Sequence, residues 1–261
     1  MEKKVALTAD GERHASMWRA LSWLRAGWQD LWRNPVPGLV HGAAFVAFGW
    51  LLLLLAHDRF WLLAGAYSGF LIVGPVVVSG LYAVSRGLQR GERLSLSQAM
   101  AVWATLDKRM VKFGLLLGFA GTGWVLTSAG FITLFAAQPV DKPLDFLRYV
   151  VLSEQSWVFG MWLLLGGMLA APMFASSVIA IPMLMDKPVS LRQALSVSWA
   201  VCASHPEAMG LWAVALMVLA GLGMLTGMLG LVVIAPWLAH ASWHVYQDMV
   251  PANMVQTQAL A

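Results

Sequence analysis

Residues 208–247 read AMGLWAVALMVLAGLGMLTGMLGLVVIAPWLAHASWHVYQ, a run of 40 residues without Asp, Glu, Lys or Arg. A straight helix of that length would be ~60 Å long, about twice the ~30 Å hydrocarbon core of a bilayer. The stretch is therefore expected to fold back once as a helical hairpin. Gly221, Gly223, Gly227 and Gly230 mark the region where a turn would cost least.

The composition of the whole chain agrees with this interpretation. Hydrophobic residues make up 59% of the 261 residues and charged residues 11%, against about 45–50% and about 25% in soluble domains. We predict a polytopic membrane protein without room for a separate soluble domain. The single cysteine, Cys202, excludes an internal disulfide and a cysteine-based metal cluster. The net charge of +4 comes from loops that face the membrane surface, so no nucleic-acid partner is expected.

The predicted fold is an all-α bundle of six transmembrane helices with three interfacial amphipathic helices. One membrane domain, 16–247, lies between polar tails at 1–15 and 248–261. The six spans are expected at 37–56, 60–85, 113–140, 155–185, 208–226 and 230–247. The amphipathic helices are expected at 16–33, 95–109 and 190–202. In the first of these, Met17, Leu21, Leu24, Trp28 and Leu31 share a face that we expect to contact acyl chains.

The distribution of basic residues predicts the orientation. Six Lys and Arg residues fall in 1–36, six in 86–112 and two in 186–207, which makes 14 on one side of a six-span bundle. Only Arg59, Lys142 and Arg148, three residues, fall on the other side. Basic loops are retained in the cytoplasm, so both termini are expected there, close to anionic lipids.

Two segments suggest an internal repeat. Residues 95–99 (SLSQA) and 190–194 (SLRQA) each follow a proline-bearing span and precede a span that opens on a glycine. A third copy follows if the chain is treated as circular. The predicted arrangement is a pseudo-threefold ring of helix pairs around the membrane normal, with three amphipathic helices forming a cytoplasmic collar.

Other residues are assigned from this arrangement. Helix kinks are expected at Pro75, Pro182 and Pro236, which occupy corresponding positions of the repeats. Interface anchors are expected at Trp28, Trp103 and Trp199. Close helix packing is expected at the small-residue pairs Gly65/Gly69, Gly114/Gly118 and Gly223/Gly227.

Three histidines are the candidates for chemistry. His240 and His244 share a helix face, and His41 is expected at a similar depth in the first span. Three imidazoles at one level would suit a metal or haem site; alternatively, they hydrogen-bond backbone carbonyls freed near Pro236 or cap the interface. No carboxylate accompanies them within the predicted spans. We therefore predict no metal, no cofactor, no catalytic residue and no enzymatic activity.

Three groups of residues carry a family resemblance. They are Gly74-Pro75 through Ser85-Arg86 to Gly91-Glu92, the segment 181–189 (IPMLMDKPV), and Leu238-Ala239-His240-Ala241 with Trp243-His244-Val245-Tyr246. Together they resemble the bacterial "predicted integral membrane protein" family, the domain of unknown function numbered 2189, over about 35–250. The resemblance implies a multi-pass protein of the bacterial inner membrane and provides no functional residues.

The leading functional hypothesis is a non-enzymatic accessory, assembly or scaffold protein that binds lipid or membrane-protein partners. A small-solute channel or transporter along the pseudo-symmetry axis is the alternative, and an open axis would favour it over a plugged one. A respiratory or redox accessory protein using His41, His240 and His244 is the third hypothesis.

Overall fold

The computed structural model describes residues 9–57, 59–104, 107–154 and 156–250. Every element within these ranges is helical, which confirms the predicted all-α class. The first half of the chain forms α1 (Ala9–Arg33), α2 (Pro35–Ala56), α3 (Phe60–Val77), α4 (Gly80–Gln89), α5 (Leu96–Ala104) and α6 (Lys108–Phe135). The second half forms α7 (Pro143–Phe146), a π-helical turn (Leu147–Val151), α8 (Ser156–Ser177), α9 (Ala180–Asp186), α10 (Leu191–Ser204), α11 (Pro206–Leu225) and α12 (Leu231–Met249).

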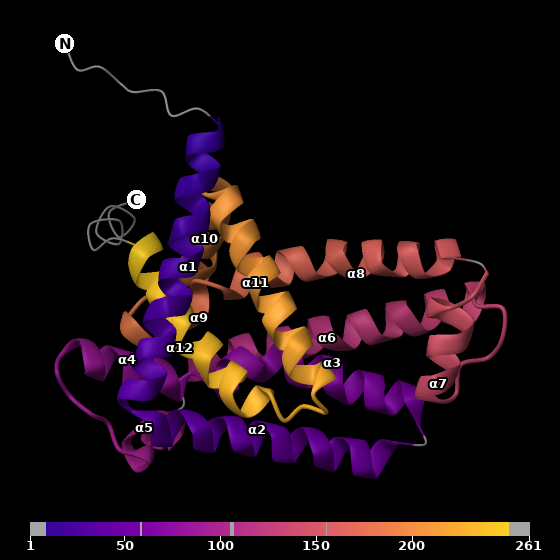
Figure 1. Cartoon of the computed structure of the whole chain (residues 1–261), viewed down its shortest axis with the longest axis horizontal. Helices are drawn as coiled ribbons and strands as arrows, with labels where there is room; N and C mark the ends of the chain where they lie inside the picture. The colour runs from indigo at the N-terminus through magenta and orange to yellow at the C-terminus, as the bar shows by residue number, and fades with distance from the viewer. Residues whose placement is uncertain (1–8, 58, 105–106, 155, 251–261) are drawn as a thin grey trace.

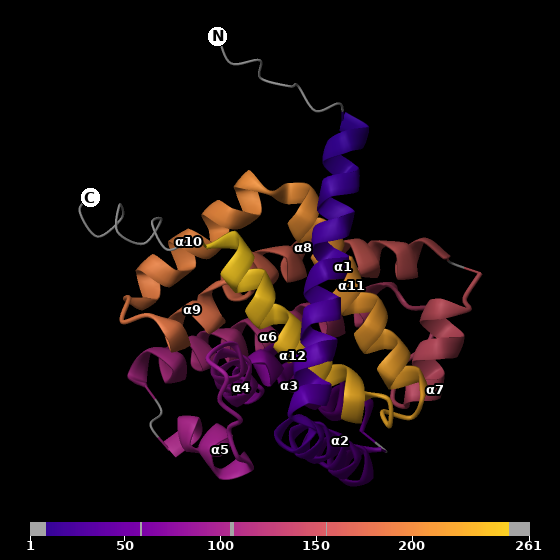
Figure 2. The same ribbon diagram turned by 60° about the vertical axis from the view of Figure 1, so that its left-hand side comes forward.

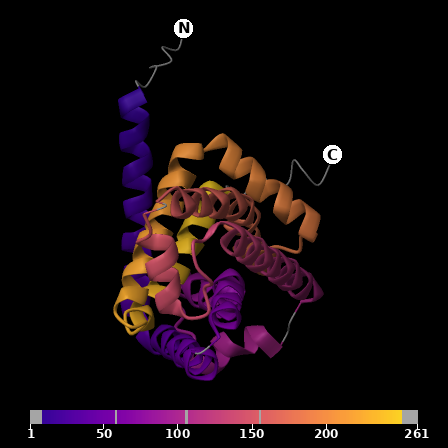
Figure 3. The same cartoon turned by 90° about the vertical axis from the view of Figure 1, so that its right-hand side faces the viewer.

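Four long helices, α2, α3, α6 and α8, run side by side and set the long axis of the molecule (Figure 1). The α2–α3 turn and α7 lie at one end of this group, which we call the loop end. The amphipathic helices α1, α5 and α10 lie with α4 and α9 at the other end, which we call the collar end. Helix α1 runs across the four long helices instead of along them (Figures 1 and 3).

Several helices have the length and composition to cross a bilayer. They are Pro35–Ala56, Lys108–Phe135, Trp157–Asp186 and Pro206–Leu225. Large apolar side chains such as Leu54, Phe119 and Met168 are exposed on them, as expected for surfaces that face lipid. The chain is therefore a multi-pass membrane protein. The count of six spans remains a prediction, because α3 and α12 are not among these four stretches.

Two of the predicted spans are each divided into two helices. Residues 60–85 contribute to α3 and α4, and residues 155–185 contribute to α8 and α9. The first division comes directly before Gly80, where an added Cβ would lie 2.6 Å from the carbonyl oxygen of Ala99 on α5. The second precedes Pro182, which has no N–H for an intrahelical bond and therefore fits the first turn of α9.

The second amphipathic helix also differs from its predicted bounds of 95–109. It ends at Ala104, because Asp107 begins α6 as its N-cap and accepts a hydrogen bond of 2.8 Å from the backbone N–H of Arg109. Helix α6 in turn ends at Phe135 instead of 140, and Ala136 already has an extended backbone conformation.

Helices α5 and α10 begin in the same way. The hydroxyl of Ser95 accepts a hydrogen bond from the backbone N–H of Gln98, whose side chain accepts one from the backbone N–H of Ser95. Ser190 and Gln193 make the same reciprocal pair at the start of α10. This capping box fixes where each amphipathic helix starts. The order of elements from α3 to α6 is repeated from α8 to α11, while the internal repeat and the pseudo-threefold ring remain predictions.

Residues 208–247 fold back once, as predicted, and form the antiparallel pair α11–α12 (Figure 2). The turn is placed at 226–230, where Gly227 and Met228 both have positive φ angles of 64° and 72°. Gly227 takes this conformation at no steric cost. The predicted cluster of glycines therefore contains the turn.

Helix α12 occupies the centre of the collar end, packed against α1, α2, α4, α9 and α11. Glycines allow the closest of these contacts. An added Cβ on Gly42 of α2 would lie 2.0 Å from the carbonyl oxygen of Val232, and one on Gly27 of α1 would lie 2.4 Å from the backbone nitrogen of Ala241. Contacts this short mean that the backbones of the helices touch.

The glycine pairs predicted for close packing behave differently. An added Cβ on Gly114 or Gly118 would have nothing within 4 Å, so the prediction is wrong for this pair. Gly69 likewise faces open space, whereas Gly65 lies near Val125. Gly223 does pack closely, against Leu231 in the hairpin itself. Glycine spacing alone did not identify which helix faces meet a neighbour.

Candidate functional site

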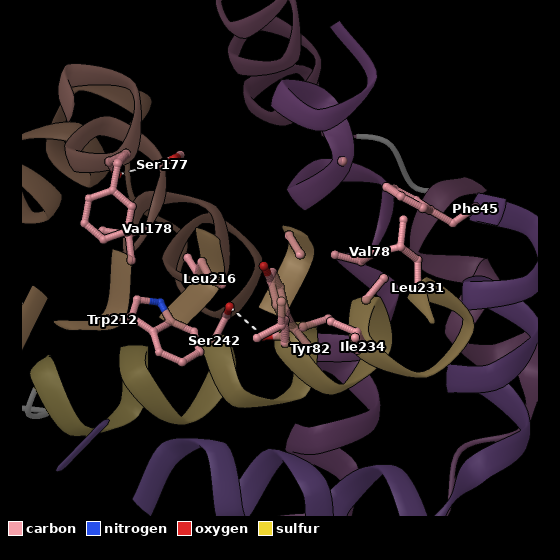
Figure 4. A pocket seen from close by; sticks show the side chains of 16 residues that line it. Phe45, Val78, Tyr82, Ser177, Val178, Trp212, Leu216, Leu231, Ile234 and Ser242 are labelled. Carbon is pink, nitrogen blue, oxygen red and sulfur yellow. Dashed lines mark hydrogen bonds between the residues drawn. The ribbon is translucent and has the colours of Figure 1, made fainter. Parts of the chain in front are cut away.

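A cavity of about 180 Å³ lies where α2, α3, α4, α8, α11 and α12 approach one another. Figure 4 shows Phe45, Val78, Trp212, Leu216 and Ile234 around it. Helix α8 packs chiefly against α6, α9 and α10, whereas α11 packs against α1, α10 and α12. The cavity therefore occupies the space between α8 and the α11–α12 hairpin, and it is open on one side.

The two serine hydroxyls at this cavity are bonded within their own helices, and the hydroxyl of buried Tyr82 is hydrogen-bonded to Ser242. Ser177 donates to the carbonyl oxygen of Met173 at 2.8 Å, and Ser242 donates to that of Leu238 at 2.8 Å. Such bonds to the preceding turn leave no free hydroxyl donor for a ligand. The remaining wall is dominated by aliphatic and aromatic side chains, so the cavity suits hydrocarbon better than a polar solute.

Trp212 closes the inner side of the cavity. Its side chain is fully buried, and its ring meets that of Trp23 on α1 edge-on, with 6.0 Å between centroids. The indole N–H has no hydrogen-bond partner among the described residues, but it also has no exposed surface. Trp212 therefore contributes packing between α11 and α1, and the cavity ends against it.

A buried polar cluster lies next to the cavity, where α12 meets α1, α2 and α4. His240 is completely buried, and its Nδ1 lies 2.8 Å from the hydroxyl oxygen of Ser85. One turn further along α12, Nε2 of His244 lies 2.8 Å from a carboxylate oxygen of Asp30. The Nδ1 of His41 lies 2.7 Å from the carbonyl oxygen of Pro37, so this nitrogen is the donor.

The three histidines predicted at one level thus have three different partners. Asp30, His244 and His41 are all close enough to interact electrostatically with His240. Even so, the described residues contain no group of three or more His, Cys, Asp or Glu side chains that would hold a metal ion. His41 does bond a backbone carbonyl, but it is that of Pro37 in its own helix and not one freed near Pro236.

Sequence reasoning missed the carboxylate of this cluster. The prediction that no carboxylate accompanies the histidines considered only the spans, and Asp30 comes from α1. Ala20, Trp23, Gly27 and Asp30 recur every three or four residues and form the face of α1 that packs on α12 and α11. That spacing was the signal available in the sequence.

The same face corrects the predicted orientation of α1. Leu31 was assigned to the surface that contacts acyl chains, but it is fully buried against the protein. Met17, Leu21 and Trp28 from that assignment do remain exposed. The apolar residues of α1 therefore divide between the protein core and the outer surface.

The predicted anchors and kinks have distinct surroundings. Trp28 is 41% exposed and its ring contacts those of Trp32 and Trp237. The indole of Trp199 donates to the hydroxyl of Ser176 at 3.0 Å. The side chains of Trp103 and Pro75 lie outside the described residues. Helix α12 continues through Pro236, so this proline does not end the helix.

Charged groups at the collar end tie the short helices together. Arg109 donates to the carbonyl oxygens of Leu184, Lys187 and Val189, which follow or close α9. The Arg109 guanidinium and backbone N–H, both bonded to the Asp107 carboxylate, lower the pKa of that group. On α10, burial raises the pKa of the Cys202 thiol. These groups act in holding the collar end together.

Comparisons with known proteins agree with this description. No curated protein and no solved structure matches the chain. The sequence model of one family does match, over residues 62–186, a little under half of the chain. The matched part runs from α3 to the end of α9 and includes the first resemblance motif and the start of the second, whereas the motif on α12 lies outside it. Residues 62–186 thus match the family described as "Predicted integral membrane protein (DUF2189)", and the resemblance noted in the sequence is confirmed over that stretch.

Proposed function

We propose that this protein is a non-enzymatic accessory or assembly component of the bacterial inner membrane that binds a lipid hydrocarbon chain. The cavity between α8 and the α11–α12 hairpin is the binding site in this proposal. In the same proposal, the collar end of the protein is the surface that binds a membrane-protein partner, and both termini are cytoplasmic. The basic loops at the collar end support this orientation, because cytoplasmic loops are enriched in Lys and Arg.

The observation that carries the proposal is the apolar character of the cavity. The hydroxyls of Ser177 and Ser242 are bonded within their own helices, and the other lining groups are mostly aliphatic or aromatic. A volume of about 180 Å³ is close to the ~150 Å³ cavities that bind benzene. It therefore accommodates one segment of a chain, with the rest of the lipid outside.

A channel or transporter receives less support from these contacts. Membrane transport sites normally contain ionisable side chains that face a water-filled path. Asp30 is the buried carboxylate among the described residues, and it is bonded to His244 at the collar end instead of facing the cavity. A redox role through the histidines would need ligands that converge, whereas these have separate partners.

The test is lipid analysis of protein purified gently from native membranes. Ala220 lines the cavity, and Met217 on the same helix is 69% exposed on the outer surface. We expect mass spectrometry of the extract to find about one lipid per protein in the native chain and in Met217→Trp, and to find that lipid lost in Ala220→Trp. Equal retention in both variants, with both folded by thermal denaturation, would contradict the site.

The partner is tested in the same preparation. We expect a membrane protein to co-purify in fixed stoichiometry with the native chain. Recovery of the chain alone, under conditions that retain the lipid, would leave a lipid-binding protein and remove the scaffold role. Stoichiometric metal or a haem absorption band lost on replacing His240 and His244 would instead favour the redox hypothesis.

A further inference from the structure

We infer that the α11–α12 hairpin is re-entrant: it enters the bilayer from the collar end, turns inside the hydrocarbon, and returns to the same side. The surface of its turn then contacts acyl chains instead of water. The length and composition of α11 allow a complete crossing, so the inference depends on where the neighbouring helices place the hairpin.

The contacts of the hairpin with α2 indicate how far it penetrates into the bilayer. Gly38 of α2 lies beside Pro236 and His240, Gly42 lies beside Val232, and Gly49 lies beside Met228. Helix α12 is thus antiparallel to α2, and only residues 231–240 run alongside it. Ten residues of helix rise about 15 Å, which is half of the ~30 Å hydrocarbon thickness.

The position of the turn also falls short of the loop end. The indole of Trp50 donates to the carbonyl oxygen of Gly227 at 2.9 Å, and Tyr67 of α3 donates to that of Gly49 at 2.8 Å. Trp50 precedes the end of α2 at Ala56 by six residues, or about 9 Å of helix. The hairpin therefore turns before it reaches the loop end, beside α2 and α3.

The remainder of α12 lies among polar groups at the collar end. His244 contacts Asp30, Tyr246 donates to Asp186 at 2.8 Å, and Trp243 donates to Gln89 at 3.2 Å. Since these nine residues, 241–249, extend beyond the start of α2 and find charged partners, they do not add to the membrane-spanning length.

The side chains of the turn suit hydrocarbon. Leu225 is 85% exposed and Leu229 is 57% exposed, and the turn contains no charged residue. Turns that face water usually carry Asn, Asp, Ser or Pro, whereas the one hydroxyl here, that of Thr226, is bonded to the backbone of Gly223 and Gly230.

Several backbone groups of the turn are bonded within the protein, which lowers the cost of placing them in lipid. The N–H groups of Met228, Leu229 and Leu231 donate to the carbonyl oxygens of Met224, Thr226 and Met228, respectively. The carbonyl of Gly227 has its bond from Trp50. A turn with apolar exposed side chains and these internal hydrogen bonds suits contact with acyl chains better than contact with water.

Cysteine labelling in reconstituted vesicles tests this inference. In a Cys202→Ser background, Leu229→Cys places one thiol on the turn, and Leu152→Cys places the matched control at the loop end, where Leu152 is 70% exposed. We expect a charged thiosulfonate, added to both sides of permeabilised vesicles, to label Leu152→Cys readily. Its rate of reaction with Leu229→Cys is expected to be at least tenfold lower. When each thiol is labelled with a small fluorophore in detergent before reconstitution, a nitroxide carried on the lipid acyl chains is expected to quench the fluorophore on Leu229→Cys and not the one on Leu152→Cys.

Two outcomes would overturn the inference. Rapid reaction of Leu229→Cys with the charged reagent, comparable to Leu152→Cys, would place the turn in water and make α11 and α12 complete spans. Absence of quenching by the acyl-chain nitroxide at Leu229→Cys would show that protein, instead of lipid, covers the turn. Reaction of both variants after denaturation in detergent controls for the thiols being intact.

Discussion

Gly42 on α2 lies directly against the carbonyl group of Val232 on α12, so that a methyl group added to Gly42 would come within 2.0 Å of that oxygen. The atom in conflict is backbone, which cannot rotate away as a side chain does. This single contact joins two segments that are 190 residues apart in the sequence, and it sets the distance between α2 and the hairpin.

Substitution of this glycine should separate the helices. We expect Gly42→Ala to lower the free energy of unfolding by about 2 kcal/mol or more, because overpacking forces backbone shifts. The matched control is Gly118→Ala, where the added methyl group meets nothing within 4 Å. The control should be neutral or slightly stabilising through helix propensity. Thermal denaturation in detergent measures both, and equal effects would show that the α2–α12 contact is looser than described.

The contact between Asp30 and His244 should be worth more than a surface ion pair. Removing one partner leaves the other buried group without its hydrogen bond, which costs about 1–3 kcal/mol, so Asp30→Ala and His244→Ala should each destabilise the protein, with non-additive effects in the double variant. Arg19 and Asp248 join the same two helices, but their side chains are 40% and 39% exposed. Their double-mutant cycle should give about 0–1 kcal/mol. Similar coupling energies for the two pairs would contradict the burial of Asp30.

The Asp107 carboxylate should make a small, pH-dependent contribution to stability. Its pKa is lowered in the folded protein by Arg109, so the stabilisation is present above the ordinary Asp pKa of about 4 and is lost as the pH falls through the lowered value. Asp107→Asn keeps a cap but removes the charge. We expect the native chain to be the more stable at pH 6 and the two to converge at pH 3; a constant difference would assign the effect to the cap alone.

Cys202 should react slowly with thiol reagents while the protein is folded. Burial raises the pKa of the thiol, and the thiolate is the reactive form, so its labelling at pH 8 should be slower than that of a free cysteine and should accelerate as the pH rises. Maleimide labelling followed by mass spectrometry measures the rate. Rapid labelling at neutral pH would show that α10 is detached from the core.

The sequence predicted those features of the fold that depend on a single segment and on the bilayer or water around it. The hairpin followed from comparing the length of 208–247 with the thickness of a bilayer, and the amphipathic helices expected from 95 and 190 do begin within one residue of those positions, as α5 and α10. The depth of the hairpin did not follow, because composition is the same for a helix that crosses a bilayer and for one that turns within it. Only the register against α2 distinguishes them.

Contacts between segments that are far apart in the sequence were the other feature that could not be predicted from it. Gly114 and Gly118 have the spacing of a packing motif but face open space, while Gly27 and Gly42 support backbone contact with α12. Asp30 lies in the first predicted amphipathic helix and its partner His244 lies in the last predicted span, so no local sequence pattern connected the two residues. Such pairs depend on the final arrangement of helices.

The clamping of α12 between α1 and α2 has a consequence for biosynthesis. Because a chain emerges from the ribosome in order, residues 9–56 enter the membrane long before residues 231–249 exist. During that interval Gly27, Gly42 and Asp30 lack the helix that they contact in the finished protein. The collar end is thus completed last, by the segment that is made last, and a chain arrested before Leu231 has its spans in place but an unfinished, chaperone-accessible surface where α12 belongs.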